Sequence, residues 1–281
     1  MATSQDQITM KTLVEAGVHM GHQTHRWNPK MRPYIHSTRN GIHIIDLEQT
    51  LPALQKACQF VAEAAKKRSN IVFVGTKKQA AEIIQEEATR CRAHYVSRRW
   101  LGGMLTNFET VRLRIVRLRE LEQMRETGEF YRRPKKEVAV LNRELLKLEK
   151  SLGGLKNMHG KPDVLFVIDV NRESLAIEEA KKIGATVVAV VDTNCDPDRV
   201  DYVIPGNDDS MRSIKLIVSA VADAIMGVSQ DAPPRTDGPD AQPSGVPGRS
   251  GRPSDGGSES GNETESASAE EGEGGGTDEN A

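Results

Sequence analysis

The sequence has 281 residues, of which 37% are hydrophobic, 28% are charged and only 4% are aromatic, and its mean hydropathy is −0.51. Its net charge of −2 combines two opposite parts: residues 229–281 hold 12 acidic and 3 basic side chains, and the rest hold 28 acidic and 35 basic ones. Because a basic body of net +7 precedes an acidic segment of net −9, the overall charge excludes no class of partner.

Membrane-spanning and secreted proteins are excluded by other features. The longest apolar stretches, residues 164–170 and 186–191, are too short to cross a bilayer, so we expect no membrane contact. The first residues lack a charged region followed by an apolar run, so we expect no signal peptide. Cys58, Cys91 and Cys195 lie far apart, which predicts reduced thiols and a cytoplasmic location.

Short β-branched runs alternate with helical patterns along the body. The predicted strands are residues 42–47, 70–75, 94–97, 164–169, 186–192 and 202–204. The predicted helices are residues 50–67, 78–91, 172–183 and 210–226. Several runs are continuously apolar, which is typical of strands covered on both faces. The pattern predicts an α/β fold of three layers with a parallel sheet, similar to flavodoxin or Rossmann folds.

Two helical segments interrupt this alternation between residues 105 and 156. Apolar side chains recur there at steps of three and four residues, namely at Phe108, Val111, Ile115, Leu118 and Leu121, and again at Val138, Leu141, Leu145, Leu148 and Leu152. This spacing predicts coiled-coil seams. Gly128 and Pro134 separate the two segments, so we expect an inserted antiparallel hairpin.

The predicted organisation therefore has three parts. Residues 1–104 and 157–228 form the α/β domain with an N-terminal arm, residues 105–156 form the inserted coiled-coil hairpin, and residues 229–281 form an acidic tail. The only aliphatic residue larger than alanine in the tail is Val246. Too little apolar surface is available there to offset the entropy of ordering, which predicts a disordered tail.

Enzymatic motifs are weak in this sequence. Residues 74–78 lie at a strand-to-helix junction, where phosphate loops occur, but they lack the spacing Gly-x-x-x-x-Gly-Lys-[Ser/Thr]. Asp169, Asn171, Asp192 and Asn194 are typical of turns and helix caps, and no nucleophile with a partner base is recognisable. We expect no enzyme and no cofactor. The alternative is a cytosolic enzyme with a small anionic ligand near residues 75–78.

Three histidines are spaced by three residues, at His19, His22 and His25. A metal site on one helical face would need such spacing, but Gly21 and Pro29 favour a loop, and neither cysteine nor carboxylate lies nearby in the sequence. We therefore expect no metal and interpret these imidazoles as hydrogen-bonding or stacking groups.

A nucleic-acid interface has broader support. Residues 98–150 hold 14 basic and 8 acidic side chains. The hairpin residues that we expect to contact phosphates are Arg112, Arg114, Arg117, Arg132, Arg133, Lys135 and Lys136. Arginine is common at phosphate-binding sites, because its guanidinium can donate to two oxygens of one phosphate at once. The alternative is a solvated coiled-coil flank with ion pairs such as Arg119 with Glu122. A further alternative is a scaffold whose hairpin pairs with another coiled coil, but the many arginines on the exposed flank count against it.

Two further clusters combine cations with the two tryptophans. Residues 25–34 suit an extended arm on structured RNA, and the candidate contacts there are Arg26, Trp27, Asn28, Lys30 and Arg32. Arg98 and Arg99 precede Trp100 at the root of the hairpin. Core packing is the alternative role for both tryptophans, and we favour it for Trp100.

Three stretches match sequence signatures of one family. They are residues 17–47, with Gly-Val-His-Met-Gly-His-Gln-Thr, Arg-Trp-Asn-Pro-Lys-Met and Asn-Gly-Ile-His-Ile-Ile-Asp-Leu; residues 99–107, Arg-Trp-Leu-Gly-Gly-Met-Leu-Thr-Asn; and residues 162–169, Pro-Asp-Val-Leu-Phe-Val-Ile-Asp. In this order, over about residues 8–228, the chain resembles the bacterial small-subunit (30S) ribosomal protein S2 family. The tail lies outside the resemblance.

The resemblance implies a structural protein of the small ribosomal subunit that binds 16S rRNA at the junction of head and body. It also implies neighbouring ribosomal proteins as partners, including ribosomal protein S1, which the family helps to dock for translation initiation. A homo-oligomer is not expected. Arg26, Trp27, Asn28 and Lys30 fall in the N-terminal signature, and Arg99, with Trp100, Gly102 and Gly103, falls in the second. His25 is a departure, because many relatives have a cation there.

Overall fold

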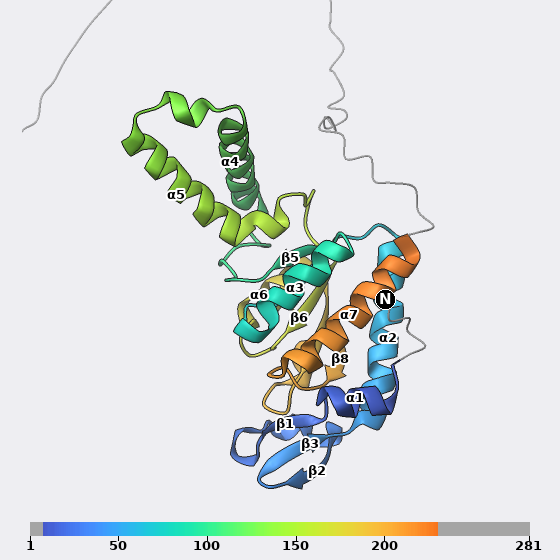
Figure 1. Ribbon diagram of the computed structural model, residues 1–281. Coiled ribbons are helices and arrows are strands. Elements are labelled where there is room, and N and C mark those ends of the chain that lie inside the picture. Colours follow the sequence, from blue (N-terminus) through green and yellow to red (C-terminus); the bar gives the residue numbers. More distant parts are fainter. Residues whose placement is uncertain (1–7, 230–281) are drawn as a thin grey trace, which may run out of the picture. The chain divides into compact units, whose positions relative to one another are not determined.

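Five parallel strands form the centre of the computed structural model, which describes residues 8–229 (Figure 1). They are β4 (Ile71–Val74), β5 (His94–Val96), β6 (Val164–Ile168), β7 (Thr186–Val191) and β8 (Tyr202–Pro205). All five come from runs predicted to be strands, and every neighbouring pair is parallel. The predicted mixed α/β fold with a parallel sheet is confirmed. The predicted tail lies outside the described residues from position 230 onward.

The strand order of this sheet is β5-β4-β6-β7-β8. The chain places β5 on one side of β4 and then adds β6, β7 and β8 on the other side. This is the order of flavodoxin-like sheets, in which the direction of strand addition reverses at one switch point. Here the switch point lies between β4 and β6, and the loops that follow the strands meet along the carboxyl edge of the sheet.

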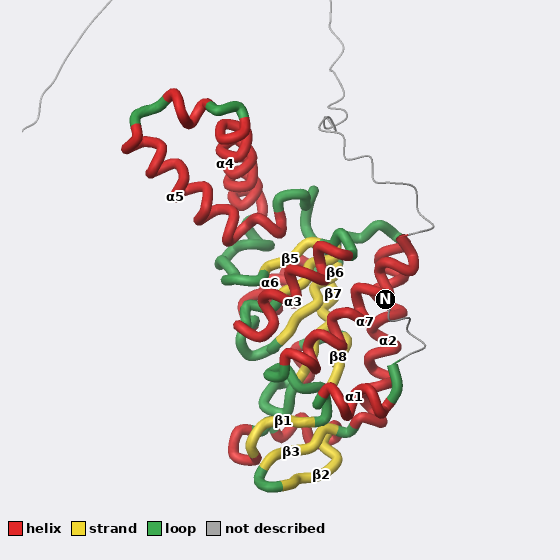
Figure 2. Tube along the Cα trace, viewed as in Figure 1, coloured by secondary structure: helices red, strands yellow, loops and turns green. Residues whose placement is uncertain are grey.

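Helices cover both faces of the parallel sheet (Figure 2). The helices on one face are α1 (Met10–Ala16), α2 (Leu47–Lys66), α3 (Lys78–Arg90) and α7 (Met211–Ser229). They pack against Phe73, Phe166 and Val188, whereas α6 (Ser174–Ile183) packs on the opposite face against Leu165 and Val187. In the described part of the chain, no helix is both long and apolar enough to span a membrane.

A second, smaller sheet departs from the prediction. It has three antiparallel strands in the order β1-β3-β2, which are β1 (Met20–Gln23), β2 (Ile35–Arg39) and β3 (Ile42–Ile45). The run 42–47 was therefore wrongly assigned to the parallel sheet. Asn40 and Gly41 both have positive φ, of 53° and 75°, which is the geometry of a tight hairpin turn between β2 and β3. Asp46 then caps α2 by accepting from the Glu48 amide.

The predicted extended arm over residues 25–34 is also wrong. This segment forms two short 3-10 helices, η2 (Thr24–Arg26) and η3 (Pro29–Tyr34). Asn28 caps η3 because its side chain accepts a hydrogen bond from the Lys30 amide. Pro29 begins the turn with a preset φ, and Met31 is fully buried. Local capping and one apolar anchor thus fold the segment back onto the body.

Two helices occupy the predicted insertion, α4 (Phe108–Glu126) and α5 (Lys135–Leu152), with η4 (Glu129–Arg132) between them and η5 (Gly153–Leu155) after them. The first turns of α4 share a buried cluster with the sheet domain through Phe108, Val111 and Ile115. Farther along, Leu118, Leu121, Phe130 and Leu145 form a separate buried cluster. We call α4, η4 and α5 the helix pair.

The root of the helix pair sits against the edge strand β5 at Gly154. A Cβ atom at this position would overlap the carbonyl oxygen and the ring of Tyr95. We expect Gly154→Ala to lower the free energy of unfolding by about 1–3 kcal/mol, because the backbone must move to relieve the overlap. Denaturant unfolding measures this change.

Gly227→Ala is the matched control, because nothing lies within 4 Å of a Cβ atom added there. This change should be neutral or stabilise α7 by up to about 1 kcal/mol. Equal effects of the two substitutions would refute the close approach at Gly154.

Candidate functional site

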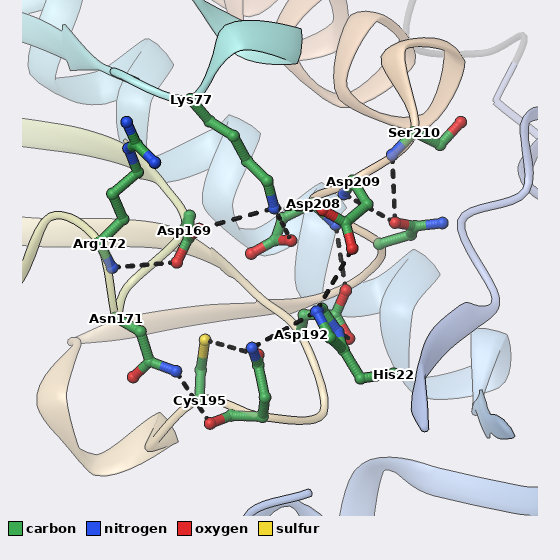
Figure 3. A network of polar contacts seen from close by, with 12 residues as sticks. His22, Lys77, Asp169, Asn171, Arg172, Asp192, Cys195, Asp208, Asp209 and Ser210 are labelled. Carbon is green, nitrogen blue, oxygen red and sulfur yellow. Dashed lines mark hydrogen bonds and ion pairs between the residues drawn. The ribbon is translucent and has the colours of Figure 1, made fainter. Parts of the chain in front are cut away.

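Side chains from four loops gather at the carboxyl edge of the parallel sheet (Figure 3). Lys77 follows β4, Asp169 follows β6, Asp192 follows β7, and Asp208 and Asp209 follow β8. Parallel strands bring their carboxyl ends to one edge, which explains why residues so far apart in the sequence meet here. Together with His22 from β1, these six residues form what we call the edge cluster.

Lys77 is the centre of the edge cluster. Its Nζ lies 2.7 Å from Asp208 Oδ1, 2.6 Å from Asp209 Oδ1 and 3.6 Å from Asp169 Oδ2. Burial works against the charge of Lys77, but the carboxylates of Asp208, Asp209 and Asp169 together outweigh it, and the pKa of Lys77 is raised. The lysine of the 74–78 segment is therefore engaged within the chain. An anionic ligand there would also meet four carboxylates, which disfavours the alternative of an enzyme using this segment.

Asp208, like Asp192, is an almost fully buried carboxylate of the cluster. Burial, together with the charges of Asp192 and Asp169, raises the pKa of Asp208 to about 7. Its Oδ1 accepts from Lys77, whereas its Oδ2 is buried and has no hydrogen-bond partner among the described residues. The cluster therefore has excess negative charge and one unsatisfied acceptor.

His22 closes the cluster from the smaller sheet. Its Nδ1 lies 3.0 Å from Asp192 Oδ1, and its Nε2 lies 3.3 Å from Asp209 Oδ2. The hydrogen bond to Asp192 raises the pKa of His22. The His22 amide donates to Thr193 Oγ1, and a Cβ atom at Gly21 would collide with the Thr193 side chain. The Gly-His pair of the first signature thus lets β1 approach the loop after β7.

A cation could be held by part of this cluster. His22, Asp208 and Asp209 each offer one ligand atom within 4.8 Å of the others, a donor set that suits zinc. The three histidines do not combine, because His25 is exposed and only His22 reaches the carboxylates among the described residues. The interpretation that no carboxylate lies near the histidines is wrong, because Asp192 and Asp209 are distant in sequence but contact His22 in the fold.

The loop after β5 is organised by Glu179 of α6. This carboxylate is only 3% exposed. Its Oε1 accepts from Trp100 Nε1 at 3.2 Å and the Gly103 amide at 2.8 Å, and its Oε2 accepts from the Leu105 and Thr106 amides at 2.9 and 3.1 Å. Burial opposes ionisation, but these hydrogen bonds outweigh it, and the pKa of Glu179 is lowered. Trp100 belongs to the core, as favoured from the sequence.

The candidate RNA contacts in the N-terminal segment differ in their surroundings. Arg26 and Arg32 are exposed and make no ion pair within residues 8–229. Trp27 is half-buried, with its ring centroid 5.2 Å from that of His43. Lys30 lies 2.8 Å from a carboxylate oxygen of Asp196 and of Asp198. Asn28 acts as a helix cap, as described above. Only the two arginines are free to meet a partner.

The candidate RNA contacts on the helix pair and at its root also divide into cations with an ion pair and cations without one. Arg112 pairs with Glu109, Arg117 with Glu144 and Glu120, and Arg133 with Glu137. The exposed candidates without an ion pair in the described part of the chain are Arg98, Arg99, Arg114, Arg132, Lys135 and Lys136. The suggested pair of Arg119 with Glu122 is wrong, because both side chains bind Lys156 instead.

Sequence reasoning missed several residues of these sites. Glu179, Asp208 and Asp209 were not singled out, and neither was Arg172, which donates from Nε to Thr76 Oγ1 at 3.0 Å. Asp169 directly follows β6, and Thr76 and Asp208 lie in the loops after β4 and β8. These positions were a usable signal, because the carboxyl ends of parallel strands converge at one edge. Glu179 lies in mid-helix, and its role depends on a loop more than 70 residues away in sequence.

The described residues thus form a parallel α/β domain with an ion-paired sheet edge, and the helix pair carries exposed cations without an ion pair. The ribosomal protein S2 family model matches residues 13–227, and the chain belongs to that family. The family has a structural, non-enzymatic role in the small ribosomal subunit and in translation. Its members act in the ribosome, with ribosomal RNA and subunit proteins as partners.

We expect Glu179→Gln to lower the free energy of unfolding at neutral pH by about 3 kcal/mol, because the amide keeps one acceptor oxygen and brings a donor toward the loop amides. The lowered pKa of Glu179 means that its contribution is present above the unfolded-state pKa near 4.5 and is lost as pH falls through the folded-state value. The variant should therefore lose stability less steeply in acid, by up to about 1.4 kcal/mol per pH unit.

Glu178→Gln is the control, since this neighbour is 58% exposed and its one ion pair within residues 8–229 is with Arg199. It should change stability by less than about 1 kcal/mol. Denaturant unfolding from neutral pH to acid measures both variants. An unchanged acid slope in Glu179→Gln would show that folding does not lower the pKa of this carboxylate.

Proposed function

We propose that this protein binds 16S rRNA at the junction of the head and body of the bacterial small ribosomal subunit. Membership of the S2 family supports a structural role in that subunit. The observation that carries the RNA-binding role is the set of exposed cations without an internal ion pair. In the described residues, these candidates are Arg26, Arg32, Arg98, Arg99, Arg114, Arg132, Lys135 and Lys136. Cations without an ion pair can neutralise RNA phosphates and so release the counterions that are condensed on the RNA.

The helix pair is proposed to be an antiparallel coiled-coil hairpin over residues 105–156, inserted between the two parts of the α/β domain. Burial of Leu118, Leu121 and Leu145 along the predicted seams supports this. A slender insertion keeps most of its surface exposed. Its tip carries Arg132, Lys135 and Lys136 outside the protein core, where they can follow an RNA groove.

The N-terminal candidates have separate proposed roles. Arg26 and Arg32 contact phosphates directly, because no carboxylate pairs with them in the described residues. Trp27, Asn28 and Lys30 hold the folded segment in place, through the His43 ring, the cap of η3 and the pair with Asp196, respectively. Lys30 reaches a phosphate only by exchanging this partner.

We further propose that the helix pair helps to dock ribosomal protein S1 for translation initiation. Leu113 is 69% exposed and Leu146 is 62% exposed, and Val116 and Val140 are also exposed. Large apolar side chains on a thin, charged element favour contact with a protein rather than with RNA. The proposal also includes action in the cytoplasm, within the small subunit, without a cofactor and without a homo-oligomer.

The RNA-binding role is tested with two triple variants of the helix pair that remove equal charge. Arg114→Gln, Arg132→Gln and Lys136→Gln remove unpaired cations, and Arg112→Gln, Arg117→Gln and Arg133→Gln remove paired ones. Filter binding to 16S rRNA over a range of salt gives the slope of log affinity against log salt. We expect the first variant to reduce this slope by about 0.7–0.9 for each phosphate that the protein no longer neutralises. The second should change it less, because those cations already have partners.

Equal slopes for the two triple variants would overturn the assignment of the unpaired set. Failure of the wild-type chain to bind 16S rRNA or to comigrate with small subunits in a sucrose gradient would overturn the function itself. Thermal unfolding of each variant checks that the helix pair remains folded.

S1 docking is tested by Leu113→Ser combined with Val116→Ser. Small subunits that carry this variant should retain several-fold less S1 after a salt wash, whereas incorporation of the variant should be normal. Val14→Ser on α1 is the control, because that side chain is 50% exposed and lies outside the helix pair. Wild-type retention of S1 by the double variant would refute docking on this face.

A further inference from the structure

A pocket of about 370 Å³ opens at the carboxyl edge of the sheet, on the β5 side of the switch point. Three segments line it: the end of β4, the loop after β5 and the start of α6. The lining residues are Thr76, Arg98, Arg99, Trp100, Arg172, Glu173 and Leu175. In flavodoxin-like sheets, ligands bind at this edge, beside the switch point.

Three arginines give the pocket a positive charge. Arg98 and Arg99 are exposed and have no ion pair within the described residues. Arg172 donates from Nε to Thr76 Oγ1, which orients the guanidinium and leaves its terminal nitrogens available. Arginines that converge on one pocket suit an oxyanion that can accept several hydrogen bonds at once.

The acidic residue of the lining already has hydrogen-bond donors within the protein. Glu173 is only 2% exposed, and its Oε1 accepts from the Thr76 amide at 2.9 Å. Burial raises the pKa of Glu173, although the hydrogen bonds from Thr76 and the charge of Arg172 act in the opposite direction. In addition, α6 has no side-chain cap, so the amides of its first turn add partial positive charge where Leu175 lines the pocket.

The adjacent edge cluster restricts where an anion can bind along the carboxyl edge of the sheet. Lys77 follows Thr76 directly but turns toward Asp208 and Asp209. An anion on that side would meet carboxylates, whereas an anion beside Thr76 meets guanidinium groups. The charge pattern therefore admits an anion only on the β5 side of the switch point.

We propose that this pocket binds a phosphate group through Arg98, Arg99 and Arg172. Either a free nucleotide or the RNA backbone can supply a phosphate. The inference goes beyond the proposed function, because it assigns a discrete site in the free protein and adds Arg172, which lies outside the sequence-predicted RNA surface.

The test uses the full chain and the fluorescence of Trp100. Since the chain has two tryptophans, Trp27→Phe leaves Trp100, at the pocket wall, as the single reporter. Inorganic phosphate, adenosine 5′-monophosphate and a short single-stranded RNA without terminal phosphates are titrated separately. Binding of the first two identifies a terminal phosphate as the ligand, and binding of the RNA alone identifies the backbone.

In the same background, Arg99→Gln with Arg172→Gln should weaken binding of the active ligand by about tenfold or more. Lys66→Gln with Lys67→Gln removes equal charge at the end of α2, near the amino edge of the sheet, and should leave binding unchanged. If the double variant does not fold, Arg99→Gln alone carries the test, because that side chain is exposed.

No Trp100 response to any of the three ligands, or equal affinity in the variants and their parent, would overturn the phosphate site. Failure of the ribosomal role would appear separately, as loss of comigration with small subunits. A protein that binds adenosine 5′-monophosphate but not 16S rRNA would retain this inference and lose the proposed function.

Discussion

The carboxylate of Glu179 holds the loop through which the sheet domain continues into the helix pair. A buried carboxylate is costly unless its oxygens are hydrogen-bonded, and here donors from Trp100, Gly103, Leu105 and Thr106 satisfy it. Because α4 begins at Phe108, the loop also fixes where that helix leaves the sheet. A hydrophobic contact alone would hold the loop with less directional precision.

The same carboxylate places the phosphate pocket. Arg98 and Arg99 directly precede Trp100, whose indole is fixed by Glu179 and by the core. The two arginines can therefore stay exposed on a backbone that has little freedom. One buried charge thus serves both the direction of the helix pair and the shape of the basic pocket wall, although it lies in neither surface.

The fold could be predicted from the sequence where burial is uniform. The strands β4, β6 and β7 are apolar at almost every position because both faces are covered, and such runs stand out. The strands β1 and β2 are short and largely exposed, so they have no apolar run or alternation. Asn40 and Gly41 were the available signal for that sheet, since this pair favours hairpin turns.

The sites could be predicted only in part, for a related reason. Clusters of arginine are visible in the sequence, but their ion pairs depend on distance in space. Arg117 binds Glu144, which is 27 residues away on the other helix, and His22 binds Asp192 across the two sheets. A count of charges assigns equal weight to all these cations. Contacts between elements decide which of them retain their capacity for a partner.

The difference between paired and unpaired cations changes how the basic region, residues 98–150, is interpreted. A glutamate at three or four residues, or on the facing helix, satisfies Arg112, Arg117 and Arg133 within the protein. Such exposed pairs add little to stability, yet they reduce the gain from binding a phosphate, because the cation must first leave its partner. The set of cations available to a polyanion is therefore smaller than the basic sequence indicates, and it comprises the tip of the helix pair, the pocket at its root, Arg114, and the N-terminal Arg26 and Arg32.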